Sequence, residues 1–184
     1  VLDACQEKQI PASTQSLTAE MPGQYSATIT GSDSGAGWYN LSDGAGGGLR
    51  TDNNHPNGFA IANTPCMILI LANVDVRDIE KGAGDKRSAF GAFQMIYRSN
   101  GANAIVPGAF CFTRPQQLTF LGATVDSVSS CDVGIVAVLD FTETPATHDI
   151  DWIGLYGATF NTDGVGTTTL VYQRASMQVI VFRP

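Results

Sequence analysis

Short apolar stretches separated by turn residues recur along this chain, and they follow two patterns. Residues 25–30 alternate between polar and apolar side chains, which predicts a strand with one buried face. Residues 67–76 and 134–141 are largely apolar and rich in Val and Ile, which predicts central strands that are buried more completely. Ile70 and Val136, in the middle of these two runs, are therefore predicted to lie in the core.

Short strands at a spacing of roughly ten residues dominate the pattern, and no segment keeps a period of 3.6 residues. This spacing favours an all-β fold, an antiparallel β-sandwich of the jelly-roll kind with about ten short strands. Asn100-Gly101 predicts a hairpin turn. Residues 75–81 are predicted to form a short helical turn, and residues 174–176 the turn of a final hairpin. The predicted strands cover residues 25–30, 59–62, 67–76, 90–97, 104–106, 109–112, 118–121, 134–141, 150–156, 167–172 and 177–182.

The length of 184 residues suits a single domain, which we place at residues 25–184. Within residues 1–24, Pro11 and Pro22 bracket a stretch rich in Ser, Thr and Gln at residues 12–20, where Leu17 is the one large apolar residue. We expect this segment to be an N-terminal arm. Such an arm either holds one helical turn or lies extended across the domain or a neighbouring molecule.

The low content of charged residues and the acidic net charge bear on which molecules the protein can bind. Charged residues make up only 15%, and the formal net charge is −7. An acidic surface repels phosphate groups, so we expect no binding to nucleic acid. No stretch approaches the ~20 apolar residues of a membrane span, so none is expected. A low density of charge is compatible with extensive contacts between subunits, because the cores of interfaces are depleted in charge.

The four cysteines contain no Cys-x-x-Cys pair, which argues against a structural zinc site. Cys66 and Cys111 lie in apolar stretches and are predicted to be buried thiols. A disulfide such as Cys111–Cys131 is the alternative.

A long loop rich in Gly, Ser and Asp is predicted at residues 31–48, and a polar stretch follows at 51–58. Loops of this length in compact domains are commonly functional or disordered. Aromatic faces stack on sugar rings, and loops at the ends of sandwiches are common binding sites. The candidate ligand-binding residues are Trp38, Tyr39, Asp52, Asn54 and His55.

Calcium is the metal that the sequence favours, because it takes six to eight oxygen ligands from loops rich in Asp and Asn. The candidate ligands are Asp149, Asp151 and Asp163. No EF-hand spacing is present, and Asp and Asn are also the ordinary residues of turns. The sequence therefore predicts either no cofactor or calcium.

Chemistry typical of enzymes has little support in the sequence. His55 and His148 are the two histidines, and no Gly-x-Ser-x-Gly elbow accompanies them. No pair of carboxylates stands out for glycoside hydrolysis, and phosphate-binding and dinucleotide-binding motifs are missing. We expect the protein not to be an enzyme.

The many short strands rich in Thr, Ala and Gly, the arm and the low charge are together similar to structural proteins of virus particles. The chain is therefore predicted to be a self-assembling structural protein, a capsid, decoration or fibre subunit that forms homo-oligomers or binds other structural subunits. Its location would be the virion or the extracellular space. The alternative is a lectin-like module that binds a glycan, with or without calcium.

Overall fold

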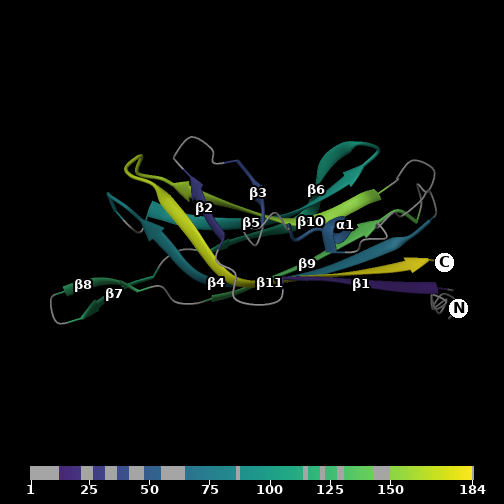
Figure 1. The fold of residues 1–184 in the computed structure, drawn as a ribbon, viewed down its shortest axis with the longest axis horizontal. Coiled ribbons are helices and arrows are strands. Elements are labelled where there is room, and N and C mark those ends of the chain that lie inside the picture. Colours follow the sequence, from purple (N-terminus) through teal and green to yellow (C-terminus); the bar gives the residue numbers. More distant parts are fainter. Residues whose placement is uncertain are drawn as a thin grey trace, which may run out of the picture.

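The computed structural model is all-β, with two antiparallel sheets that face each other as a sandwich (Figure 1). This confirms the predicted fold class. The single helix in the described part of the chain is the one-turn α1 (Thr51–Asn54). The structure describes residues 13–21, 27–31, 37–41, 48–54, 65–85, 88–113, 116–120, 123–127, 131–142 and 150–183.

The first sheet has the strand order β1-β11-β4-β9, and β2 also pairs with β11. Its strands are β1 (Ser13–Met21), β2 (Ala27–Gly31), β4 (Met67–Lys81), β9 (Cys131–Asp140) and β11 (Thr168–Arg183). The second sheet has the order β3-β10-β5-β6. Its strands are β3 (Tyr39–Asn40), β5 (Ala89–Ser99), β6 (Ala102–Thr113) and β10 (Ile150–Asn161). A separate hairpin joins β7 (Gln116–Phe120) to β8 (Ala123–Ser127) and lies apart from both sheets (Figure 1).

The strands pair in a nested order along the sequence: the first strands pair with the last, and the pairs then move toward the middle of the chain. β1 and β2 pair with β11, β3 pairs with β10, β4 pairs with β9, and β5 pairs with β6, all antiparallel. β1 and β2 contact different halves of β11, so together they take the place of one first strand. A long hairpin whose strand pairs are distributed alternately over two sheets is the jelly roll. The topology therefore confirms the jelly-roll prediction.

The core lies between the two sheets, where every second residue of each strand points inward. In the first sheet Ile70 of β4 lies between Val179 of β11 and Ala137 of β9, and all three are buried. In the second sheet Phe93 and Met95 of β5 are fully buried. These inward rows belong to one hydrophobic cluster that spans both sheets.

Ile70 is a core residue, as predicted, but the prediction for Val136 is wrong. The Val136 side chain is 66% exposed. In β9, Ile135 and Ala137 point into the core, so Val136 between them points outward. The continuous apolar run suggested two covered faces, whereas only one face of β9 packs against the second sheet. Cys66 is a buried thiol, as predicted.

Two segments that were predicted to be turns are strands in the structure, because pairing with neighbouring strands keeps their backbone extended. Residues 75–81, predicted as a helical turn, continue β4, which pairs with β11 as far as Thr168↔Lys81. Residues 174–176, predicted as a hairpin turn, lie inside β11, where the register shifts beside Arg174. Backbone pairing on both edges of β11 overrides the local turn preference. The Asn100-Gly101 turn is confirmed, with φ of 50° and 78°.

Residues 13–21 of the predicted N-terminal arm form β1, which runs from Ser13↔Arg183 to Met21↔Ala175 along β11. This part of the arm is therefore extended across the domain, one of the two arrangements expected for it. The division of the chain at residue 24 stays a prediction.

A matched pair of substitutions tests which face of the first sheet is the core. Ile70→Ala should lower the free energy of unfolding by about 2–5 kcal/mol, because it leaves a cavity in a closed core. Val136→Ala should cost less than about 1 kcal/mol, because its side chain is already in solvent. Urea denaturation of both variants measures the difference. Equal losses would contradict the assignment of the two faces.

Candidate functional site

Five aromatic side chains meet on the outer face of the second sheet, and we call them the aromatic cluster. They come from three strands and from the residue before β3. Their members are Trp38, Phe90 of β5, Phe110 and Phe112 of β6, and Phe160 of β10.

Strand alternation places these rings on the outside. In β5, Ala89 is buried in the core, so the neighbouring Phe90 points outward, directly opposite Phe160 of β10. In β6, Ala109 points into the core, and Phe110 and Phe112 are 44% and 58% exposed. The cluster is therefore a surface feature that is separate from the core.

The rings of the cluster pack mostly edge to face. Phe110 and Phe112 lie 4.4 Å apart between centroids at an interplanar angle of 82°. Trp38 lies 5.7 Å from Phe110 at 69° and 6.1 Å from Phe160 at 66°. Phe90 and Phe160 are stacked at 5.0 Å and 12°. Such geometries are the preferred ones for aromatic pairs, each worth about 0.5–1.5 kcal/mol beyond the area buried.

Small residues beneath the rings make room for this packing. Ala92 of β5 pairs with Ala158 of β10 on one side and with Phe112 of β6 on the other. Both alanines are fully buried although they lie outside the core cluster. Because they face the same side as the rings, the aromatic cluster covers them. The outer face of the second sheet thus has an apolar layer of its own.

Trp38, a predicted ligand-binding residue, belongs to the aromatic cluster, half-buried between Phe110 and Phe160. Tyr39 is the first residue of β3, where it pairs with Gly157 of β10. Its side chain is 52% exposed. The predicted long loop therefore contains an edge strand. Of the two aromatic residues, Tyr39 keeps more of its ring surface available to a ligand.

Asp52 lies beside Arg50 and Trp152, away from Trp38. Its carboxylate accepts two hydrogen bonds from Arg50, at 3.0 and 2.8 Å, and the Arg50 guanidinium lies 4.7 Å from the centroid of the buried Trp152 ring. Trp152 and Phe160, the neighbours of these two sites, are eight residues apart on β10, or about 27 Å along a strand. The structure therefore does not bring Asp52 to Trp38. Asn54 ends α1, and His55 lies outside the described residues.

Tyr156 lies beside Arg50 on the same edge, where its ring stacks on Trp152 at a centroid distance of 6.1 Å. Burial raises the pKa of the Tyr156 hydroxyl, and the Arg50 guanidinium opposes that rise. The phenol is therefore neutral at physiological pH and acts as a packing residue beside the Arg50–Asp52 ion pair.

The predicted calcium ligands are not brought together. Asp151 lies near the start of β10 and ion-pairs with Arg98 at 3.5 Å, whereas Asp163 follows the end of that strand. Asp149 lies outside the described residues. Within the described ranges, no group of three or more His, Cys, Asp or Glu side chains is arranged to hold a metal ion. Calcium binding stays a prediction.

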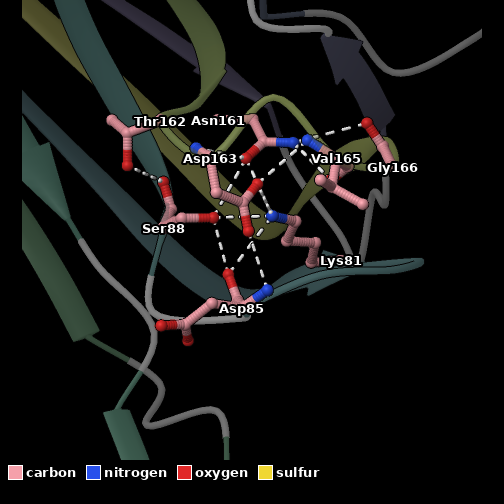
Figure 2. A network of polar contacts seen from close by, with 8 residues as sticks. All are labelled: Lys81, Asp85, Ser88, Asn161, Thr162, Asp163, Val165 and Gly166. Carbon is pink, nitrogen blue, oxygen red and sulfur yellow. Dashed lines mark hydrogen bonds and ion pairs between the residues drawn. The ribbon is translucent and has the colours of Figure 1, made fainter.

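Asp163 instead takes part in a polar network around the ammonium group of Lys81 (Figure 2). The Lys81 side chain is fully buried. Its Nζ donates hydrogen bonds to Ser88 Oγ at 2.6 Å, Asn161 Oδ1 at 2.8 Å, the Asp85 carbonyl at 3.2 Å, and Asp163 Oδ1.

Both carboxylate oxygens of Asp163 are used within this network. Oδ1 accepts from Lys81 and from the Val165 backbone N–H, and Oδ2 accepts from the Asp85 backbone N–H. Lys81 above all, together with these N–H groups, holds the pKa of the Asp163 carboxyl well below its usual range. The network joins the turn after β4 to the turn after β10, and so links the two sheets at one end of the sandwich.

Sequence reasoning found Trp38 but missed the four phenylalanines of the aromatic cluster. The available signal was the spacing of Phe110 and Phe112, which places both rings on one face of a strand. That spacing predicts a shared face without saying which face is the core. Phe90 and Phe160 come together only through the register of β5 and β10, which the sequence does not display.

Comparison with known proteins finds no matching family model and no similar sequence among curated proteins. Among the described residues, no helix is both long and apolar enough to cross a membrane.

Several solved structures are distantly similar in fold. A structure of infectious bursal disease virus, Gx strain, matches with a TM-score of 0.46 and 9% identity, covering 94% of this chain and 34% of that chain. The VP2 subviral particle of the same virus matches with a TM-score of 0.46 and 10% identity, covering 94% and 38%. The chain thus spans little more than a third of these viral proteins.

A xylan-binding module of the CBM15 type matches with a TM-score of 0.31 and 9% identity, covering 89% of this chain and 97% of that module. Likenesses this distant carry no argument about function.

Two substitutions test whether the aromatic cluster is a packed layer. Phe160→Ala should destabilise the protein by about 1–3 kcal/mol, because Phe160 stacks on Phe90 and contacts Trp38. Phe112→Ala should cost about 1 kcal/mol or less, because the Phe112 ring is more than half exposed. Chemical denaturation followed by Trp fluorescence measures both. A larger loss for Phe112→Ala would contradict this packing order.

Proposed function

We propose that the chain is a self-assembling structural subunit of a virus particle, as part of a capsid, a decoration or a fibre or spike. The observation that carries the proposal is an exposed apolar patch on each outer face of the sandwich. Antiparallel sheets that face water normally carry polar side chains on that side. Large apolar patches on soluble proteins mark interaction sites.

The outer face of the first sheet carries one of the two apolar surfaces. Val136 and Val138 of β9 are 66% and 48% exposed. The register places Val138 beside Leu69 of β4, which pairs in turn with Ile180 of β11. Val136 lies beside Leu71 in the next outward row. A cavity of about 430 Å³ opens on this sheet between β9, β4 and β11, with Leu71, Gly134 and Val136 in its lining.

The outer face of the second sheet carries the other surface, formed by the aromatic cluster and Ile105, which is 59% exposed. The two surfaces lie on opposite sides of the sandwich and differ in their residues. If one surface of a subunit binds the other surface of its neighbour, the contacts are heterologous, and such contacts generate rings or filaments. This arrangement favours copies of the same chain as the partners of these surfaces.

The composition agrees with this proposal. Only 15% of the residues are charged, and the outer rows around Val136 and Phe112 are mostly apolar or small. Interface cores are depleted in charge and enriched in aromatic residues. We propose, in keeping with the sequence analysis, that the protein acts without catalysing a reaction on a substrate, and that it resides in the virion.

The alternative is a glycan-binding module, and the exposed ring of Tyr39 favours it. Sugar stacking requires an open aromatic face. Phe110 and Phe112 of the aromatic cluster are also exposed, at 44% and 58%, but their rings pack edge to face with each other, so the cluster favours protein contacts. The glycan site of this alternative is therefore centred on Tyr39, beside the edge of the second sheet.

Light scattering after size exclusion, with negative-stain images of the same fractions, tests the assembly proposal. We expect an oligomer, a filament or a shell whose population rises with protein concentration. A single species at the chain mass of 19.4 kDa at every accessible concentration would contradict the proposal.

Matched variants identify the contact surface. Val136→Thr combined with Val138→Thr should raise the concentration for half-assembly tenfold or more, about 1.4 kcal/mol. Threonine keeps the β-branched shape, so the melting temperature of the dissociated subunit should change little. Val165→Thr is the control, because Val165 is 46% exposed in the turn between β10 and β11 and lies on neither sheet face.

Glycan-array binding tests the alternative. If the alternative is right, Tyr39→Ala should abolish binding while leaving the melting temperature nearly unchanged, because the ring is half exposed. Phe112→Ala serves as the control for a general effect of removing an exposed ring. Binding that survives Tyr39→Ala would exclude the Tyr39 site.

A further inference from the structure

The buried amine of Lys81 lies against a carboxamide, with a carboxylate in contact with the same amine, in a part of the fold that the proposed assembly surfaces do not use (Figure 2). We propose that Lys81 and Asn161 join in an intramolecular isopeptide bond, formed by the protein itself after folding. The proposal is independent of what the protein assembles with.

The nucleophile and the electrophile come from opposite sheets and meet at one end of the sandwich. Lys81 is the last residue of β4, in the first sheet, and Asn161 is the last residue of β10, in the second. Lys81 Nζ lies 2.8 Å from Asn161 Oδ1. Asn161 is only 4% exposed, and the Lys81 side chain is fully buried. Holding two reactants in contact replaces a bimolecular step by an intramolecular one, which lowers the barrier strongly.

The carbonyl oxygen of Asn161 is surrounded by donors. Besides Lys81, the Ser88 hydroxyl lies 3.0 Å from Oδ1, and the Asp163 backbone N–H donates to it at 3.4 Å. The single Ser88 proton is shared between this oxygen and the Asp85 carbonyl, 2.6 Å away. Donors already directed at the oxygen stabilise the negative charge that develops there when an amine attacks the carbon.

Asp163 is placed to move the protons. Its Oδ1 contacts Lys81 Nζ directly. Transfer of one proton from the Lys81 ammonium to Asp163 gives the neutral amine, which is the nucleophilic form. The amine attacks Cγ of Asn161, and the negative charge passes to Oδ1.

The bond from Cγ to Nδ2 then breaks. Asn161 Nδ2 donates to the Val165 carbonyl at 2.7 Å and to the Gly166 carbonyl at 3.3 Å, so this amino group is held away from Lys81. The proton on Asp163 and the second proton from Nζ pass to Nδ2, the charge on Oδ1 returns to re-form the carbonyl, and Nδ2 leaves as an ammonium ion. Asp163 is again a carboxylate, and the mass of the chain falls by that of one ammonia. The chain gains one amide bond and loses one ammonia, and no oxidant, metal or cofactor takes part.

The contacts of Lys81 also indicate how fast the isopeptide bond should form. The Lys81 ammonium and the Asp163 carboxylate form an ion pair, so a proton must leave the Lys81 amine before that amine can attack. Bond formation should therefore follow folding and be slow.

Intact-mass measurement of the denatured full-length chain tests the proposal. The protein is refolded, and its mass is followed over days at neutral and at alkaline pH. We expect a mass lower than that of the sequence by one ammonia, in a fraction that increases with time. Tandem mass spectrometry of a digest should yield a branched peptide that joins Lys81 to Asn161, with protease resistance after Lys81. A full-length mass equal to that of the sequence under all conditions would overturn the proposal.

Controls separate this bond from another loss of ammonia. The sequence contains Asn57-Gly58 and Asn100-Gly101, and such pairs can lose one ammonia by closing to a succinimide. Loss of ammonia located at those asparagines, without a branched peptide, would also overturn the proposal. Lys81→Arg, which keeps the charge but removes the amine, should restore the full mass. Asp163→Asn should do the same if Asp163 moves the protons. Where either variant fails to fold, the branched peptide of the unaltered chain decides.

Discussion

The structure depends on one constraint: the two sheets of the sandwich pack against each other through one face of each. Burial of the rows around Ile70 in the first sheet and Phe93 in the second holds the two sheets together. Because side chains alternate along a strand, fixing these inward rows also fixes which residues face outward. The aromatic cluster, the exposed valines of β9 and the contacts of Lys81 at the end of β4 all follow from that choice of faces.

The outer faces are where the molecule departs from a simple soluble sandwich. A sheet exposed to water gains little from valine or phenylalanine on its outer side, and such residues promote association. Here Val136 and Phe112 lie on opposite sides of the fold. The polar groups, in contrast, are used within the chain: Arg50 pairs with Asp52, and Lys81 with Asp163. Two of its ion pairs thus lie within the fold, while part of its apolar side chains lie on two external surfaces.

The sequence predicted the class of fold but only part of the surface. Period-two patterns and the Asn100-Gly101 turn are local signals, and they identified the sandwich and one hairpin correctly. The exposure of Val136 depends on which face of β9 meets the other sheet, and the length of β11 depends on pairing with distant strands. The contacts of Phe90 with Phe160 and of Lys81 with Asn161 join residues 70 and 80 positions apart, which no local pattern reveals.

The nested pairing of strands has a consequence for the order in which the subunit is completed. β11 lies between β4 on one side and β1 and β2 on the other, so the middle of the first sheet is a strand that follows all its partners in the sequence. Contacts between residues so distant in sequence make folding slow. The chain loses conformational entropy when the long loops close, before the stabilising contacts have formed. Until β11 is in place, β4 and β9 lack the neighbour that completes their sheet. A chain that lacks β11 therefore cannot present the finished outer face of the first sheet.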